Sequence, residues 1–238
     1  MTIPGLAFSD RLPPAHPGQP SSILLIGGDA GLANSLRRAG YMVSCHALDM
    51  GPMAQRPGVP FTAPVVAWPF PDQTFAAVVL LDELALVVQE EEALAEAARV
   101  LLPGGILLLR VPASGRLAWL DGYNAYRYLR DISHRGQPLA ETRGVGWRRH
   151  YRRADIRDLL RPHFRMRRLR GFGLGLSDAS RLGLNLFWRW LLRSPRGDAA
   201  IERIPRRLAR IEGNVSVFGR GYWLVAVAEK QSDWRVHP

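Results

Sequence analysis

Short apolar runs alternate with amphipathic stretches along the first half of the chain. Residues 23–26 are all apolar, which predicts a strand buried on both faces of a sheet. After Gly31, the residues Leu32, Leu36 and Ala39 recur at helical spacing. We therefore expect a helix that packs its apolar face against this strand.

The same alternation continues as far as residue 111. Apolar runs predict further strands at 41–45, 65–68, 76–81 and 106–111. Residues 90–101 predict a helix that begins with three glutamates, which the positive end of a helix stabilises. Strands that alternate with helices predict an α/β fold with a mostly parallel sheet and helices on both of its faces.

The second half of the chain is less regular. It predicts a helix at 154–164, a strand at 165–172 and a final strand at 222–229. Between these two strands lies a basic, amphipathic insertion at about 174–219, which we expect to be helical. Because the final strand would return to the sheet, we expect a single domain over 21–238 that includes the insertion.

Several features limit where the protein can work. Residues 1–20 are rich in proline and lack the basic start and continuous apolar run of a secretory signal, so we expect an irregular N-terminal arm. Cys45 is the single cysteine, which excludes an intramolecular disulfide and favours a reducing compartment. No stretch reaches the roughly 18 apolar residues of a membrane span.

Positive charge is concentrated in one part of the chain. The net charge is +11, and residues 143–220 hold twenty arginines against six acidic residues. Such a segment suits phospholipid headgroups, a phosphorylated substrate or a nucleic acid, and a solvated basic face is the alternative. No RNA-binding or DNA-binding motif accompanies the charge, which argues against nucleic acid. The sequence thus predicts a cytoplasmic protein, with peripheral binding at the inner face of the membrane as an open alternative.

Residues 68–112 carry the most specific pattern, WPFPDQTFAAVVLLDELALVVQEEEALAEAARVLLPGGILLLRVP. A proline-phenylalanine-proline-aspartate turn, a buried strand that ends in an acid, an Ala- and Leu-rich helix and a Pro-Gly-Gly strand start follow one another. In this order of features the chain resembles the class I S-adenosylmethionine-dependent methyltransferases of the methyltransferase type 11 kind. The resemblance implies a Rossmann-like methyltransferase fold with a seven-stranded sheet, an antiparallel last strand, and S-adenosylmethionine as the cofactor.

The resemblance also implies a place for the cofactor, over the carboxyl ends of the first strands. Glycines there let a ligand approach the backbone, and a helix N-terminus offers free N–H groups. The residues expected at this place are Gly27, Gly28 and Gly31 in the turn, residues 69–72 with Asp72 on the adenine side, and Asp82 and Glu83 beyond the fourth strand.

The polar contacts that the family uses around this turn are largely replaced. Leu25 stands where the family has an acid, Asp29 where it has the middle glycine, and Ala47 where an acid grips the ribose hydroxyls. Hydrogen bonds to such a carboxylate are worth roughly 1.5–3 kcal/mol each. Asp29 and Asp49 are the candidates to replace the missing contacts, and Asp29 can equally serve as the N-cap of the next helix.

Methyl transfer from a sulfonium requires alignment of the reactants and a nucleophile that has lost its proton. His150 and His134 are the candidate bases, and Asp82 and Tyr151 are the candidates to orient them, because they follow strand ends or precede the next helix. The alternative is that His150 belongs to a solvated, arginine-rich surface. No residues have metal-ligand spacing, so we predict no metal site.

The insertion holds the most distinctive helix. In RLGLNLFWRWLLR, Arg181, Asn185, Arg189 and Arg193 recur every four residues and form one narrow polar stripe. A helix that is apolar everywhere else must be buried on most of its circumference or lie in a membrane interface. We expect it to face an anionic bilayer or a lipid-like substrate, or else to form a lid on its own domain or in a homodimer.

Two hypotheses for the function follow from these patterns. The first is an S-adenosylmethionine-dependent methyltransferase that acts on a small hydrophobic or lipid-linked acceptor. The alternative is a catalytically inactive methyltransferase-like protein that uses the fold for binding or for assembly with a protein partner.

Overall fold

Six strands of the computed structural model, counted over the part of the chain that it describes, form one mixed sheet. In chain order they are β1 Ser22–Ile26, β2 Met42–His46, β3 Phe75–Leu81, β4 Leu101–Pro112, β5 Phe164–Phe172 and β6 Trp223–Lys230. Their spatial order is β2-β1-β3-β4-β6-β5. The structure describes residues 6, 8–14, 21–27, 30–46, 67–87, 89–115, 117–133, 148–192, 203–205, 207–208, 211–212 and 221–231.

The sheet is parallel except for β6. β1 pairs in parallel with β2 and β3, and β3 pairs in parallel with β4, whereas β6 runs antiparallel to both β4 and β5. The antiparallel last strand and the Rossmann-like fold expected from the sequence are confirmed. From β1 the chain moves to β2 on one side and then to β3 on the other. The carboxyl ends of β1 and β3 therefore form a topological switch point, where open α/β sheets bind ligands.

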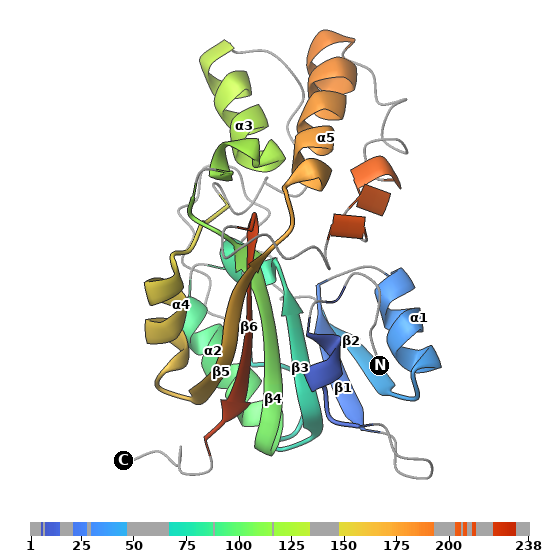
Figure 1. Cartoon of the computed structure of the whole chain (residues 1–238), viewed down its shortest axis with the longest axis vertical. Coiled ribbons are helices and arrows are strands. Elements are labelled where there is room, and N and C mark those ends of the chain that lie inside the picture. The colour runs from blue at the N-terminus through green and yellow to red at the C-terminus, as the bar shows by residue number, and fades with distance from the viewer. Residues whose placement is uncertain are drawn as a thin grey trace.

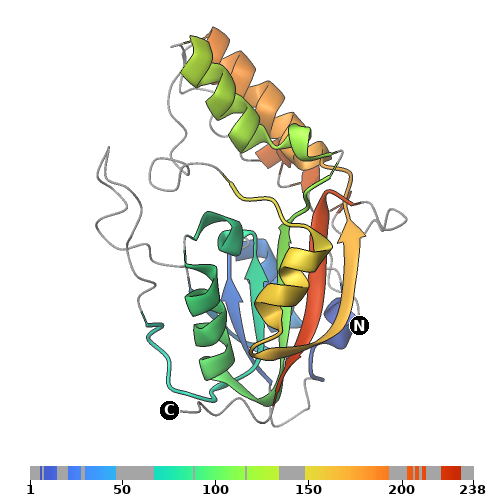
Figure 2. The same cartoon turned by 90° about the vertical axis from the view of Figure 1, so that its left-hand side faces the viewer.

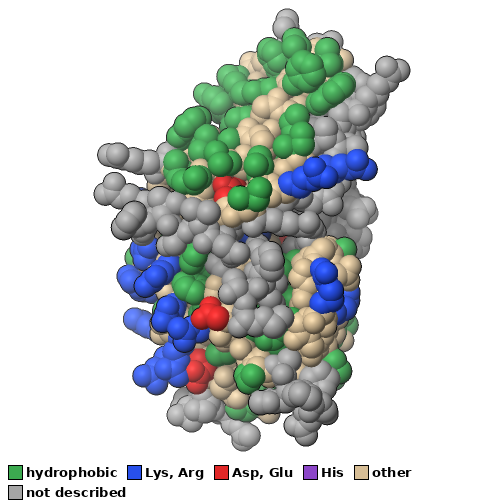
Figure 3. Space-filling model, turned by 45° about the vertical axis from the view of Figure 1, so that its right-hand side comes forward, with side chains coloured by type: hydrophobic (Ala, Val, Ile, Leu, Met, Phe, Trp, Pro, Cys, Tyr) green, Lys and Arg blue, Asp and Glu red, His purple; other side chains and the backbone are tan. Residues whose placement is uncertain are grey.

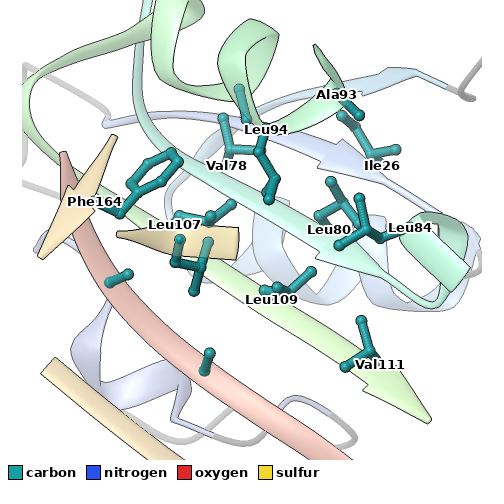
Figure 4. Close-up of a cluster of buried hydrophobic side chains, with 14 of the residues drawn as sticks. Ile26, Val78, Leu80, Leu84, Ala93, Leu94, Leu107, Leu109, Val111 and Phe164 are labelled. Carbon is teal, nitrogen blue, oxygen red and sulfur yellow. The ribbon is translucent and has the colours of Figure 1, made fainter. Parts of the chain in front are cut away.

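Helices cover both faces of this sheet (Figure 1 and Figure 2). They are α1 Ala30–Arg38 on one face, and α2 Glu90–Val100 and α4 Arg153–Leu160 on the other. Successive strand residues point to opposite faces, so Ile26 and Val78 join the core under α2, while Leu25 and Val79 join the core under α1. Figure 4 shows Leu94 of α2 next to Val78 in the first of these cores.

The described part of the N-terminal arm packs against the face that carries α1. It forms a 3-10 helix at Ser9–Arg11, and Leu6 and Leu12 on either side are buried in the core under α1. The ring of Phe8 lies 5.1 Å from that of Phe172. These residues are more regular than the irregular arm expected for 1–20, because their apolar side chains cover strand surface that α1 leaves open.

The strand predicted at 65–68 is wrong for the residues that the structure describes, Ala67 and Trp68, which belong to no strand. The Trp68 N–H donates to Glu96 Oε2 at 2.8 Å, and its carbonyl accepts from Arg99 at 3.1 Å. Side chains of α2 thus satisfy this backbone in place of a strand partner. Residues 65 and 66 lie outside the described residues, so the sheet has six described strands where seven were expected.

Other elements also differ from the sequence prediction. The helix predicted at 154–164 ends at Leu160, and Phe164 instead begins β5, because it pairs with Lys230 of β6. β4 begins at Leu101, five residues before the expected start, because Leu101 pairs with Phe75 across an irregularity in the register. A further helix, α3 Gly122–Ser133, forms where the hydrophobic pattern predicted no element. Its Tyr126 is fully buried, but Tyr128 and Ile132 are exposed, so the helix lacks the broad apolar core face that makes a helix recognisable in a sequence.

A helical lobe stands over the carboxyl ends of the parallel strands (Figure 1 and Figure 2). We define it as residues 117–133, 174–192 and the described residues of 203–212. It contains α3, α5 Leu176–Asn185, and a π-helical turn at Leu186–Leu191. The helix predicted within 181–193 is thus confirmed over its described part, as α5 followed by the π turn. A Cβ on Gly122 would lie 2.6 Å from the carbonyl oxygen of Asp178, so glycine allows α3 and α5 to approach closely. Among the described residues, no helix is long and apolar enough to cross a bilayer.

Candidate active site

The turn after β1 lies at the switch point and requires glycine at its first position. Gly27 has a left-handed backbone with φ of 74°. A Cβ at this residue would lie 2.2 Å from the carbonyl oxygen of Leu81, the last residue of β3. Both observations exclude a side chain. Since α1 begins at Ala30, the free N–H groups of a helix N-terminus follow this turn directly.

The other glycine and acid predictions divide into two groups. Gly31 lies in the first turn of α1, beside the place where a ligand would meet the helix N-terminus. Gly28, Asp29 and Asp49 lie outside the described residues, as does His134. The roles predicted for Asp29 and Asp49 in compensating the missing acids stay predictions.

Asp72 lies near the amino ends of the parallel strands, whereas Gly27 lies at their carboxyl ends. It precedes β3, whose seven residues separate it from Asp82, and it forms a 2.6 Å ion pair with Arg99 of α2. The structure therefore does not bring Asp72 together with the other predicted cofactor residues. The aromatic ring of Phe70, in the same turn, lies 5.1 Å from that of Phe75 at the start of β3 and 5.7 Å from the imidazole of His46 at the end of β2.

Glu83 brings a carboxyl group to the glycine turn. Its Cγ lies 2.9 Å from the position that a Cβ of Gly27 would occupy. Burial raises the pKa of the Glu83 carboxyl, and the neighbouring carboxylate of Asp82 raises it further. An acid that the sequence placed only generally in the pocket thus lies directly against the cofactor turn.

Asp82 itself is held by arginines. The residue has a left-handed backbone with φ of 63°, and its carboxylate accepts hydrogen bonds from Arg110 at 2.5 and 3.3 Å. The guanidinium of Arg110 also lies 5.1 Å from the ring centre of Trp223. Because both carboxylate oxygens of Asp82 bind Arg110, this side chain is suited to fixing the strand end.

A buried arginine joins Asp82 to the helical lobe. Arg148 is only 6% exposed, and its guanidinium lies 2.7 Å from Asp178 of α5, 3.8 Å from Asp121 before α3, and 3.9 Å from Asp82. Burial opposes its charge, but the surrounding carboxylates raise the pKa of Arg148 well above its usual value. Tyr222 donates a further 2.5 Å hydrogen bond to Asp178. This cluster ties three separate segments to one cation.

His150 faces Asp121 across the same cluster. His150 Nε2 lies 3.2 Å from Asp121 Oδ2, and Asp121 is 1% exposed. Burial alone would raise the pKa of Asp121, but His150 and the Arg148 charge lower it below its usual value. Asp121 also accepts the Asn124 backbone N–H at 3.2 Å, in the manner of an N-cap. An ionised, immobilised carboxylate beside an imidazole is the arrangement that orients a general base.

Asp121 is the functional candidate that the sequence prediction missed. The signal for it was an aspartate immediately before Gly122, in the position of an N-cap, but α3 itself was not expected. Asn124 strengthens the arrangement, since its side-chain amide donates to the Arg148 carbonyl at 2.7 Å and accepts the Arg148 N–H at 2.8 Å. His150 follows Arg148 by two residues, so these hydrogen bonds hold in place the segment that carries His150.

Tyr151 is placed differently from the prediction that it orients His150. It is buried, its hydroxyl donates to the Leu84 carbonyl at 3.1 Å and contacts Glu90, and burial together with Glu90 raises the pKa of its hydroxyl. Its side chain thus anchors the segment to α2. His150 and Tyr151 also line a groove of about 490 Å³ between α2 and α4, so His150 is reachable from outside.

Residues 28–109 match the sequence profile of a family described as "Methyltransferase domain". No curated protein matches the chain. A solved structure of a putative sarcosine dimethylglycine methyltransferase from Galdieria sulphuraria is 18% identical, with a TM-score of 0.50 and coverage of 89% of this chain and 79% of that chain. This match supports the fold.

Two further solved structures resemble the chain more loosely. A putative methyltransferase from Bacillus halodurans is 17% identical, with a TM-score of 0.47 and coverage of 91% of this chain and 95% of that chain. The 1,6-didemethyltoxoflavin-N1-methyltransferase of Burkholderia thailandensis, solved with S-adenosylhomocysteine bound, is 20% identical. Its TM-score is 0.46, and the match covers 90% of this chain and 72% of that chain.

Proposed function

We propose that this chain is a class I S-adenosylmethionine-dependent methyltransferase that transfers a methyl group to a small hydrophobic or lipid-linked acceptor. The match of residues 28–109 to a methyltransferase-domain profile supports this proposal. The observation that carries this proposal is the turn at Gly27. It lies at the switch point of the sheet, excludes a side chain, and leads into the N-terminus of α1.

The residues around this turn suit the cofactor chemically. Gly27 and Gly31 offer backbone that a ligand can approach closely, and Glu83 offers a carboxyl group to the positively charged part of the cofactor. Asp29 and Asp49 are proposed as additional contacts to the ribose. When bound, S-adenosylmethionine supplies an electrophilic methyl group on a sulfonium.

We propose His150 as the general base that takes the proton from the acceptor. Asp121 holds the imidazole through the 3.2 Å contact, and Arg148 keeps Asp121 ionised. An oriented base of this kind contributes about 10²–10⁴-fold to a rate. The remaining demand of the reaction is alignment of the acceptor with the methyl group, which a shaped site can meet without further catalytic groups.

The surroundings of the site support the proposed acceptor class. The helical lobe stands beside the carboxyl end of the sheet, and it exposes large apolar side chains such as Trp119 and Leu191. A hydrophobic or lipid-linked acceptor would find apolar surface there. We propose that the enzyme works in the cytoplasm and binds peripherally at the inner face of the membrane.

Calorimetric titration with S-adenosylmethionine and S-adenosylhomocysteine tests the cofactor assignment directly. We expect saturable binding of both ligands by the full chain. An absence of heat at millimolar concentrations of either ligand would refute the methyltransferase proposal in favour of an inactive, methyltransferase-like binding protein.

The role of His150 needs a separate comparison. Replacing His150 by Gln should lower methyl transfer by about 10²-fold or more while cofactor binding stays unchanged. His163→Gln is the matched control, because His163 lines the same groove away from Asp121. Equal losses in the two variants would show that His150 is not the base.

A further inference from the structure

Large apolar side chains gather on the outer surface of the helical lobe (Figure 3). Trp119 is 71% exposed, Ile132 of α3 is 59% exposed, and Leu191 of the π turn is 62% exposed. We give the name lobe face to nine of the exposed apolar side chains of the lobe: Trp119, Tyr128, Leu129, Ile132, Phe187, Leu191, Leu192, Ile204 and Ile211. Exposed apolar surface of this extent marks an interaction site.

Several polar side chains of the lobe are buried, in contrast to the exposed apolar side chains of the lobe face. Asp121, Asp178, Asn185 and Glu212 are all buried. The Glu212 carboxylate accepts backbone N–H groups of residues 174, 176 and 177 at 2.9–3.2 Å, at the start of α5. Several polar side chains of the lobe are therefore buried while many of its large apolar side chains are exposed, which is unusual for a surface that faces only water.

Among the side chains that the structure describes in the lobe, the charged ones that are exposed are arginines. Arg203 and Arg207 are exposed next to the exposed Ile204 and Ile211, whereas each of the three acidic side chains that the structure describes in the lobe is buried. Over residues 186–210 the sequence holds seven arginines and two acidic residues. Apolar and aromatic side chains accompanied by arginines match an anionic lipid surface, where rings and alkyl groups enter the headgroup boundary and guanidinium groups meet phosphates.

We infer that the lobe face docks this protein on an anionic lipid bilayer. A second copy of the chain fits the same face less well, because a twofold interface would place two arginine-bearing faces of the same charge against each other. The benefit of such docking rests on the proposed function. The lobe stands over the carboxyl end of the sheet, so a docked protein would hold its candidate active site next to lipid-linked acceptors.

Vesicle flotation with the full chain tests this inference. We expect wild-type protein to float with vesicles of phosphatidylglycerol and phosphatidylcholine, and not with phosphatidylcholine alone. The double variant Ile132→Ser/Leu191→Ser should bind the anionic vesicles at least about tenfold more weakly, since it removes two large apolar groups from the face. Both residues are exposed, so the fold should survive, which circular dichroism can verify.

The contribution of charge has its own variants. Arg203→Gln and Arg207→Gln should each weaken binding to anionic vesicles by about fivefold at low salt. Met42→Ser on β2 and Arg165→Gln on β5 are the matched controls, because both residues are exposed outside the lobe. Neither control should change flotation.

Three results would overturn the inference. They are no flotation of the wild type with anionic vesicles, unchanged flotation of Ile132→Ser/Leu191→Ser, and a wild-type dimer that this variant dissociates in sedimentation velocity without any vesicle binding. Titration of the same variant with S-adenosylmethionine separates the two proposals. Retained cofactor binding with lost flotation supports docking, while intact flotation without cofactor binding by the wild type refutes the methyltransferase proposal alone.

Discussion

Replacing the buried Arg148 by Met should destabilise the protein more than any surface change. The substitution keeps much of the side-chain volume but leaves Asp178 and Asp121, at 2.7 and 3.8 Å, without their cation. Breaking a buried ion pair by removal of one partner costs about 3–5 kcal/mol. For a chain of this size that corresponds to a fall in Tm of roughly 6–20 °C.

The pH dependence of this loss follows from Asp121. Its pKa in the folded wild type is lowered, so it contributes stability that is present above its unfolded pKa and is lost as the pH falls through its folded pKa. The His150 contact that lowers the pKa of Asp121 remains in the variant, but the lowering by the Arg148 charge is lost, so the pKa of Asp121 rises and protonation more readily relieves the buried charge. The difference in free energy of unfolding between the wild type and Arg148→Met should therefore be smaller at about pH 5 than at about pH 8.

Urea unfolding at both pH values, followed by circular dichroism, measures the two quantities together. Arg165→Gln, on the exposed edge strand β5, is the control and should change stability by no more than about 0.5 kcal/mol. A loss below about 1 kcal/mol for Arg148→Met, or a loss that does not vary with pH, would refute the view that Arg148 neutralises these carboxylates.

Three other predictions follow from individual contacts. Gly27→Ala should lower the free energy of unfolding by about 2–5 kcal/mol, because it adds left-handed backbone strain to a clash with the Leu81 carbonyl. Thermal unfolding measures this loss, and a neutral effect would contradict the turn described here. Glu212→Gln should speed hydrogen exchange at the backbone amides of Leu174 and Ser177, because it removes the charged acceptor of these N–H groups, while exchange in α1 should stay the same. Unchanged exchange at Leu174 and Ser177 would contradict the capping role of Glu212. Glu83→Gln should weaken S-adenosylmethionine binding by about 10–100-fold in calorimetry. The wild type should bind more tightly as the pH rises through the raised pKa of Glu83, and a variant with the same pH dependence would exclude this contact.

The parallel part of the fold was predictable because its strands are buried on both faces. Apolar runs such as 76–81 and the spacing of Leu32 and Leu36 define elements without reference to distant residues. The strand expected at 65–68 failed at Trp68 because side chains of α2 satisfy its backbone, a contact that no local pattern records. The helix α3 was not predicted either, because several of its large apolar residues are exposed and so do not form the apolar core face by which a helix is recognised in a sequence.

The candidate site was predictable in its glycines and less so in its charges. Gly27 was predicted through the resemblance, and His150 was predicted from its place in the loop before the next helix. Asp121 was missed because its partners Arg148 and His150 lie 27 and 29 residues away, and Asp178 lies farther still. Sequence separation of this kind carries no periodic signal, so only the folded chain reveals which charges meet.

The position of β6 has a consequence for how the chain is made. This last described strand lies between β4 and β5 and pairs with both. During synthesis, β4 and β5 would therefore wait with unpaired edges until residues 223–230 had left the ribosome, and such edges are templates for wrong pairing. Four exposed arginines lie along β5, at positions 165, 167, 168 and 170. During that interval they would repel the β5 of a second nascent chain and so disfavour wrong pairing before β6 is inserted.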